Sequence, residues 1–227
     1  MSRSGRSSHG GRPRGSSRSG RRRSYHHGDL AEAMVHAALG LITEFGPSGF
    51  SFAEVTRIVG VSPAAPYRHF RDRDALVAHI AEKGFDLLAA KLAKAWNKGA
   101  PDTSKAFQSL GQAYLTFAAK EPAYYAAMFN AHFPDDLMTD VRKASDGAFA
   151  VLREATEVLL EKVPKEKRPP ALMVSLHVWS MTHGIVSLYG AGHSPRHMIP
   201  MEPGDLLEAG LLVYLEGLGL SWHDAPN

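Results

Sequence analysis

Two short apolar-periodic runs separated by a glycine constrain the fold of this chain more than any other feature. They lie in the stretch SFAEVTRIVGVSPAAPYRHF, residues 51–70. Ser51 and Glu54 have the spacing of a capping box, which predicts that a helix begins there. Gly60 ends this helix, because a residue without Cβ adopts the left-handed conformation at little cost. Ser62 can then cap a second helix, so the pattern predicts a helix-turn-helix.

Two prolines stand in the second helix of this motif. Pro63 falls at the first helical position, where its missing N–H removes no hydrogen bond. Pro66 lies three residues further on and removes a hydrogen bond near the first turn. We therefore expect this second helix to begin late or irregularly.

Helical periodicity continues through the rest of the chain. Apolar residues recur at three- and four-residue steps from Asp29, which is placed to cap a helix, to Gly46, which ends it. No period-2 run long enough for a strand is present, so the expected fold class is all-α. Further helices are expected at 72–98, 103–120, 122–130, 135–163, 171–189 and in a last segment that contains Leu206 to Leu218.

Charge is distributed unevenly along the 227 residues. The net charge is +3, but residues 1–28 hold eight arginines and no acid, which leaves −5 for the remainder. Residues 1–24 are mainly Gly, Ser and Arg and cannot form a core, so we expect a disordered basic arm. This arm could neutralise DNA phosphates or be a solvated extension. A transit segment fits less well, because the arm lacks an apolar face.

Composition disfavours several classes of protein. The chain has no cysteine, which excludes disulfides and thiol catalysis. It has no apolar run of about 18 residues and no apolar signal segment, so neither a membrane span nor secretion is expected. No nucleophile–base pair or phosphate loop is visible. We therefore expect a cytoplasmic protein that is not an enzyme and has no cofactor.

The second helix of the motif carries side chains that suit contact with a DNA duplex. Its two alanines allow close approach to base edges and could meet thymine methyl groups. Its tyrosine and histidine can donate to phosphates, and an arginine at the start of the next helix adds charge. The alternative is that these side chains only cover a helix junction. The candidate contact residues are Ser51, Ala64, Ala65, Tyr67, His69 and Arg73.

The stretch EVTRIVGVSPAAPYRHFRDRDAL, preceded by YHHGDLAEAMVHAAL, resembles the N-terminal domain of TetR-family transcriptional regulators. The similarity spans about residues 25–80 and rests on the Gly-Val-Ser turn, the Tyr-x-His-Phe run and the basic residue that follows. Many members have lysine where this chain has Arg73. The resemblance implies phosphate contacts by Tyr67, His69 and Arg73, and proximity to the bases for Ser62, Ala64 and Ala65.

The C-terminal half is also similar to this family. Residues Trp179 to Gly184 look like the Trp-x-x-x-His-Gly (WHG) signature of one TetR C-terminal subgroup, which implies a dimerising, effector-binding domain. The last two helices are more apolar than one small core requires, which favours a symmetric dimer. We expect a helix-turn-helix DNA-binding domain at 25–75 and a helical effector-binding and dimerisation domain at 76–227.

Large aromatic residues indicate where a small hydrophobic or amphipathic effector would bind. Trp179 and His183 share a helix face, and the imidazole could fix a carbonyl or acid on an apolar ligand. Ordinary core packing is the alternative. A metal site that uses His193 and His197 is disfavoured, because Pro195 places this pair in a loop. The candidate effector residues are Tyr114, Phe117, Tyr125, Met128, Phe129, Trp179 and His183.

The sequence as a whole predicts a homodimeric repressor. It would bind a palindromic operator in double-stranded DNA and be released by a small organic effector. Two alternatives remain at this point. One is an architectural DNA-binding protein without an effector, and the other is a helical enzyme that uses His183.

Overall fold

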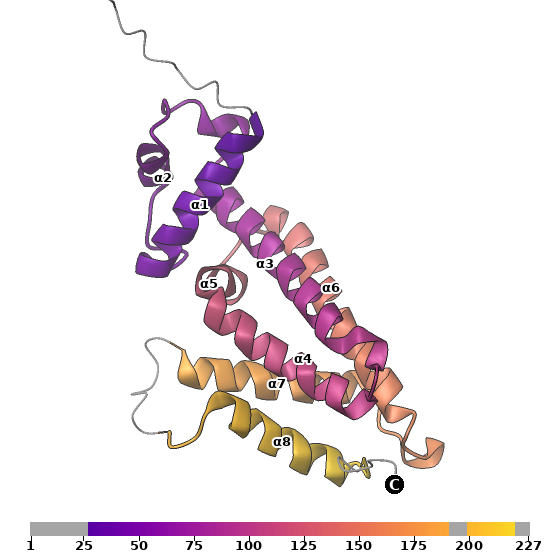
Figure 1. Cartoon of the computed structure of the whole chain (residues 1–227). Coiled ribbons are helices and arrows are strands. Elements are labelled where there is room, and N and C mark those ends of the chain that lie inside the picture. The colour runs from indigo at the N-terminus through magenta and orange to yellow at the C-terminus, as the bar shows by residue number, and fades with distance from the viewer. Residues whose placement is uncertain (1–26, 191–198, 221–227) are drawn as a thin grey trace, which may run out of the picture.

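The computed structural model describes residues 27–190 and 199–220, and this part of the chain contains helices and no strand (Figure 1). The all-α fold class is therefore confirmed. The α-helices are α1 (His27–Phe45), α2 (Phe52–Val59), α3 (Arg73–Trp96), α4 (Thr103–Lys120), α5 (Pro122–Asn130), α6 (Asp135–Leu160), α7 (Ala171–Tyr189) and α8 (Pro203–Gly217). Short 3₁₀ helices are η1 (Pro66–Arg68), η2 (Asn97–Gly99) and η3 (Lys165–Lys167).

A small N-terminal head and a larger helical body share the helix α3. The head contains α1, α2 and η1, and α3 runs from it along α6 into the body (Figure 1). Leu76, Ile80 and Leu88 of α3 are fully buried. One continuous apolar core extends from α1 to α8. The boundary proposed at residue 75 therefore lies in the first turn of a helix that both parts use.

The first helix and the turn of the motif form as expected. The Oγ atom of Ser51 accepts the backbone N–H of Glu54 at 3.2 Å, and the Glu54 carboxylate accepts the backbone N–H of Ser51 at 2.7 Å. Gly60 follows α2 with a φ of 74°, where a side chain would be strained. Val55 is fully buried and fixes α2 to the core.

The second helix of the motif differs from the expectation. Ser62 caps no α-helix, and residues 63–65 form a turn that leads into η1. The backbone N–H of Ala65 reaches the Ser62 carbonyl at 3.1 Å, but Pro66 has no N–H with which to continue toward an α-helix. The next turn closes when the His69 N–H bonds the Pro66 carbonyl at 2.9 Å. The α-helix expected from Pro63 is therefore wrong, and one 3₁₀ turn takes its place.

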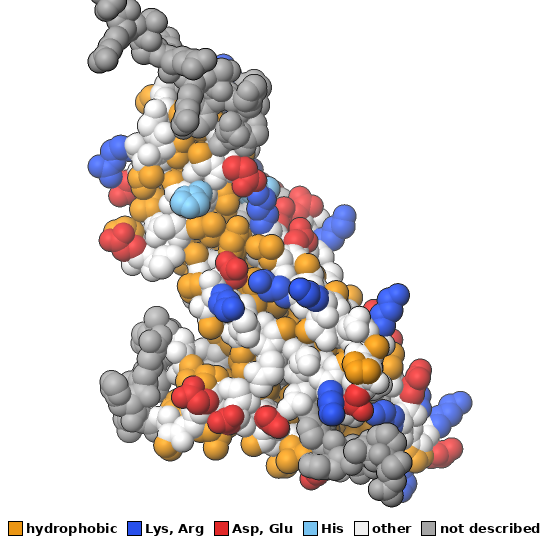
Figure 2. Space-filling view, in the orientation of Figure 1, with side chains coloured by type: hydrophobic (Ala, Val, Ile, Leu, Met, Phe, Trp, Pro, Cys, Tyr) orange, Lys and Arg blue, Asp and Glu red, His pale blue; other side chains and the backbone are white. Residues whose placement is uncertain are grey.

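Helices α7 and α8 leave several apolar side chains exposed. The exposed fractions of Leu176 and Val213 are 49% and 73%. By length and composition alone α7 could cross a membrane. Its most apolar 18 residues have a mean hydropathy of 1.3, and 28% of them are buried in the structure. One such helix is weak evidence for a membrane span, since a core helix of a soluble protein can have the same length and composition. On the side seen in Figure 2, acidic side chains also lie over α8. Further exposed apolar residues of α7 are Leu172, Met173 and Leu188.

Candidate nucleic-acid interface and effector site

Residues 62–69, which we call the recognition segment, contribute with α2 to one outward surface of the head. Tyr67 is 61% exposed and rests on Phe52, with ring centroids 5.3 Å apart. Figure 2 shows basic side chains at the edge of the head where α2 lies. We call this outward surface the reading surface, and it consists of the exposed residues Arg57, Ser62, Ala64, Tyr67 and Arg68.

A hollow of about 330 Å³ lies within the reading surface, between α2 and the recognition segment. Sequence reasoning missed Arg57, which lines this hollow, and Arg68, which is the exposed neighbour of Tyr67. Both residues could have been identified in the sequence, because each is a basic residue in a helix, one before and one after the turn at Gly60. The residues that line the hollow are Phe52, Ala53, Thr56, Arg57, Val61, Pro63 and Tyr67.

Three of the candidate DNA contacts are partly buried or already hydrogen-bonded within the protein. Ala65 is partly buried and packs against the core, so only Ala64 of the two alanines faces outward. His69 is partly buried and its Nε2 atom is shielded from solvent, which does not suit a phosphate contact through that atom. Ser51 is exposed, but its hydroxyl donates to the Glu54 carboxylate at 2.8 Å. Contacts with DNA by these residues stay predictions.

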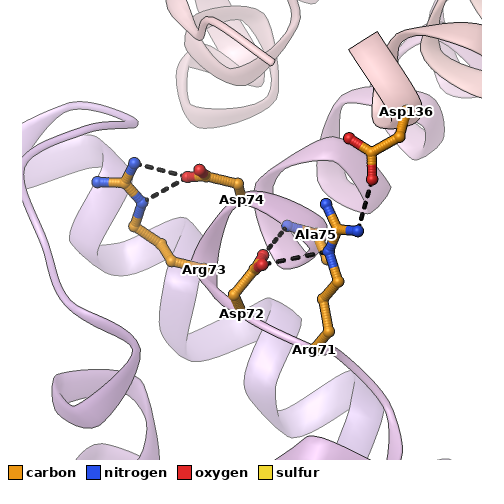
Figure 3. A network of polar contacts seen from close by, with 6 residues as sticks. All are labelled: Arg71, Asp72, Arg73, Asp74, Ala75 and Asp136. Atoms are coloured by element: carbon orange, nitrogen blue, oxygen red, sulfur yellow. Dashed lines mark hydrogen bonds and ion pairs between the residues drawn. The ribbon is translucent and has the colours of Figure 1, made fainter. Parts of the chain in front are cut away.

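Arg73 is tied to its own head (Figure 3). Its Nε and Nη2 atoms donate to the Asp74 carboxylate at 2.9 and 2.6 Å, and Nη1 donates to the Ser48 carbonyl at 3.1 Å. These bonds join the α1–α2 connection to the start of α3, which Asp72 caps by accepting the N–H of Ala75 at 2.8 Å. The geometry favours a positioning role for Arg73, and its phosphate contact stays a prediction.

Arg71 connects the head to the body. Its guanidinium donates to the carboxylate of Asp136 in the first turn of α6 and also pairs with Asp72 at 3.2 Å (Figure 3). The hydrogen bond from Arg71 lowers the pKa of Asp136. Both side chains are about half exposed, and solvent screens such pairs so that they add little stability. The pair therefore orients the head on the body more than it stabilises the fold.

The body contains a polar cluster on α4, α5 and α7. The hydroxyl oxygens of Tyr114 and Tyr125 lie 3.0 and 2.8 Å from Nδ1 of His183. Burial lowers the pKa of His183 and raises that of Tyr125 to about 12, and burial likewise raises the pKa of Tyr114. Near neutral pH the imidazole is therefore uncharged and both phenols keep their protons. A neutral Nδ1 can accept one hydroxyl proton, and the two phenols also interact with each other.

Aromatic rings surround this cluster. The rings of Phe129 and His183 lie 4.8 Å apart, and those of Tyr114 and Trp179 lie 5.8 Å apart. Phe149 of α6, which was not among the candidates, packs 5.3 Å from Trp179. We call this group the aromatic cluster. Its members are Tyr114, Tyr125, Phe129, Phe149, Trp179 and His183.

Two candidate effector residues are buried and take no part in the ring contacts of the aromatic cluster, and their contact with an effector stays a prediction. Phe117 is fully buried, and among the described residues its ring forms none of the ring pairs that make up the aromatic cluster. Met128 is buried against α3, where a Cβ on Gly84 would meet its Sδ atom at 2.7 Å. The structure therefore brings together five of the seven candidates and leaves these two in the core.

The space beside the aromatic cluster is small in this conformation. A cavity of about 20 Å³ borders Tyr114 and Trp179, which is room for about one water molecule. Pockets for organic ligands usually enclose about 300–1,000 Å³. An organic effector could enter here only if side chains of the cluster move apart.

Partly buried histidines link the stability of the fold to pH. Burial lowers the pKa of His183, and burial followed by the charge of Lys83 lowers that of His79 against a smaller effect of Glu32. Both side chains bind protons more weakly in the folded chain than in the unfolded chain. The stability they contribute is thus complete above the unfolded pKa of about 6.5 and is lost as the pH falls below it.

We expect the urea midpoint of unfolding to fall as the pH is lowered from about 7.5 to about 5.5. The substitution His79→Gln removes one of the two groups and should make this fall smaller. His132→Gln, at an exposed position, serves as the control and should leave the pH dependence unchanged. An equal fall in wild type and His79→Gln would contradict the assignment to His79.

Nothing in residues 27–190 and 199–220 resembles a metal site, since no group of three or more His, Asp or Glu side chains there could hold a metal ion. The alternative metal site involved His193 and His197, which lie outside the described residues, as does the basic arm at 1–24.

Comparisons with known proteins agree with this architecture. The family model described as "Bacterial regulatory proteins, tetR family" matches residues 34–80, and the model "Tetracyclin repressor-like, C-terminal domain" matches residues 107–214. An uncharacterized HTH-type transcriptional regulator of Bacillus subtilis (strain 168), YobS, is 28% identical over 186 residues, which are 82% of this chain and 90% of that protein.

Solved structures show the same fold. A protein of unknown function from Rhodococcus sp. RHA1 is 27% identical with a TM-score of 0.73, over 86% of this chain and 98% of that one. The TetR-family regulator PfmR from Thermus thermophilus is 20% identical with a TM-score of 0.57, over 80% and 97%. Membership of the WHG subgroup stays a prediction. The two family models and these relatives show that the chain belongs to the TetR family of DNA-binding transcriptional regulators and is not an enzyme.

Proposed function

We propose that this regulator is a repressor that binds a palindromic operator as a homodimer and leaves it when a small organic effector binds. The observation that carries the proposal is the placement of two unlike surfaces on one chain. The reading surface lies on the head, and the exposed apolar side chains belong to α7 and α8. Figure 1 shows both of these helices in the body. A DNA-binding regulator acts where the DNA is, so we place it in the cytoplasm.

Helices α7 and α8 supply the apolar surface for the proposed dimer. Leu172 and Leu176 are four residues apart and therefore lie on one side of α7, and both are about half exposed. Exposed apolar surface of this kind marks a contact surface, and a twofold dimer is the commonest arrangement. Two heads related by a twofold axis would enter successive major grooves about 34–36 Å apart.

Roles on the DNA follow from exposure. We assign phosphate contact to Tyr67, whose hydroxyl lies at the end of a mostly exposed side chain. Ser62 and Ala64 are exposed and small, which suits close approach to base edges. Arg68, next to Tyr67 in η1, adds a second donor to the DNA backbone. An architectural protein would need the same contacts but would show no preference among sequences.

The aromatic cluster is the proposed binding site for the effector. A ligand with aromatic surface could separate Trp179 from Tyr114 and hydrogen-bond to the neutral His183, so an apolar molecule with one polar group fits best. Because the cavity is about 20 Å³ in this conformation, the ligand would favour a different packing of α4, α5 and α7. Helix α6 packs against α7 and pairs with the head through Asp136, which gives that change a route to Arg71.

To identify the effector, the DNA duplex to which the chain binds is first selected from random sequences. A panel of small aromatic and amphipathic compounds is then added to the complex of the chain with this duplex. We expect at least one compound to release the DNA. His183→Phe should then require about tenfold more of that compound, the equivalent of one lost hydrogen bond of about 1.4 kcal/mol. His132→Phe, at an exposed position, is the control and should respond like wild type. An equal response of wild type and His183→Phe would contradict this site.

A further inference from the structure

Two of the four arginines between residues 57 and 73 are engaged within the protein. Arg71 pairs with Asp136 and Asp72, and Arg73 pairs with Asp74 and the Ser48 carbonyl. Within the described residues no ion pair or hydrogen bond holds the guanidinium of Arg57 or Arg68. These two side chains are exposed and can meet a ligand without breaking a hydrogen bond or an ion pair, although the hydrogen bonds from Ser51 and, less strongly, the charge of Arg57 lower the pKa of the nearby Glu54.

Arg57 differs from Arg68 because it lines the hollow of the reading surface. The walls of this hollow are largely apolar and come from both halves of the helix-turn-helix. Thr56 also lines it, but its hydroxyl donates to the Phe52 carbonyl at 2.9 Å and is therefore occupied. The free donors of the hollow are then the Tyr67 hydroxyl and the guanidinium of Arg57.

Before η1, the recognition segment offers no side chain that can bond a base through two hydrogen bonds. Residues 62–65 are Ser, Pro, Ala and Ala, which allow close approach but do not distinguish guanine from adenine by a paired contact. Guanine presents O6 and N7 to the major groove, and an arginine guanidinium bonds both atoms together. Charge and hydrogen-bond geometry therefore match Arg57 to a guanine edge.

We propose that Arg57 determines sequence specificity by bonding O6 and N7 of one guanine in each operator half-site, with the edge of that base pair at the mouth of the hollow. This proposal rests on the proposed binding of a specific duplex. The assignment differs from those of Tyr67 and Arg68, which contact the DNA backbone and carry no base preference.

The test uses the full chain and a duplex that wild type selects from random DNA. Every base pair of that duplex is then changed in turn, and each guanine is also replaced by 7-deazaguanine, which lacks the N7 acceptor. Arg57→Ala should bind the selected duplex about 5- to 150-fold more weakly and lose its preference at one base pair per half-site. Replacement of that guanine should lower the DNA affinity of wild type and leave the DNA affinity of Arg57→Ala nearly unchanged.

Two further variants separate a base contact from a charge effect. Arg57→Lys keeps the charge but loses the paired geometry, so it should lose most of the preference for guanine. Tyr67→Phe removes one hydroxyl from the same hollow and should weaken binding to all duplexes alike, without a change in preference. Arg57 is exposed, so its variants should keep the wild-type circular dichroism and thermal midpoint.

Two outcomes would overturn the proposal. If Arg57→Ala weakens every duplex equally and only lowers the salt dependence, Arg57 contacts a phosphate. If its base preferences and affinity equal those of wild type, Arg57 makes no contact. In both cases wild type still selects a DNA sequence, so the proposed function as a sequence-specific regulator is retained and only the role of Arg57 is rejected. A wild type that selects no sequence would overturn the proposed function and the Arg57 assignment together.

Discussion

Leu176→Glu should convert the dimer into monomers and weaken operator binding by about 10²- to 10⁴-fold. Leu176 is 49% exposed on the outer side of α7, between other exposed apolar residues of the same helix. A carboxylate there would be buried without a partner in a dimer, which is strongly unfavourable. Each head would then bind its half-site alone, and the gain from linked binding would be lost. Sedimentation equilibrium gives the mass, and fluorescence anisotropy with the selected duplex gives the affinity.

Leu87→Glu is the matched control for this experiment. Leu87 is also a leucine with an exposed fraction of 40%, but it lies on α3, away from α7 and α8. The Leu87 variant should keep the dimer mass and the operator affinity. If Leu176→Glu remained a dimer with wild-type affinity, α7 would not be the contact between copies.

Phe117→Ala should lower the free energy of unfolding by about 3–5 kcal/mol. Phe117 has no exposed surface in α4, so the substitution removes buried contacts and leaves a cavity that the neighbouring helices fill only in part. Urea denaturation at one fixed protein concentration measures the change. Phe45→Ala is the control, because Phe45 is 53% exposed, and it should change the free energy by about 0.5 kcal/mol or less.

The same experiment separates the two interpretations of Phe117. A residue that lined an open effector pocket would have part of its surface free, and its truncation would cost far less stability. A loss for Phe117→Ala as small as that for Phe45→Ala would therefore place Phe117 in a pocket and contradict the packing described here.

Much of the fold could be predicted from the sequence, because most of its signals are local. The capping box of Ser51 and Glu54 and the left-handed Gly60 depend only on residues a few positions apart. The prolines at 122 and 170 likewise mark the starts of α5 and α7. Periodicity alone is sufficient for the long helices, although α6 ends at Leu160 and not at residue 163.

The recognition segment shows where local signals compete. Ser62 and Pro63 both favour the start of an α-helix, and Pro66 opposes it three residues later. These signals predict an irregular start, but whether an α-helix or a 3₁₀ turn results depends on how Phe70 and Ala65 pack against the core. That packing is a tertiary property and has no local signature.

The sites were predictable only in part, because their contacts join distant segments. The Arg71–Asp136 pair spans 65 positions and the Tyr114–His183 bond spans 69. Residue type together with the four-residue spacing on one helix indicated Trp179 and His183, which both lie in the aromatic cluster. It could not show that Phe117 points into the core, because a fully buried phenylalanine and one that lines a pocket look alike in the sequence.

We propose that two copies of this chain read one operator, each through its own head. Selection of duplexes from random DNA, followed by measurement of the mass of the selected complex, tests this arrangement. We predict an inverted repeat whose half-sites are centred about 10–10.5 base pairs, or 34–36 Å, apart and which binds two copies of the chain. A single unrepeated site that binds one copy, or no preferred sequence at all, would contradict it.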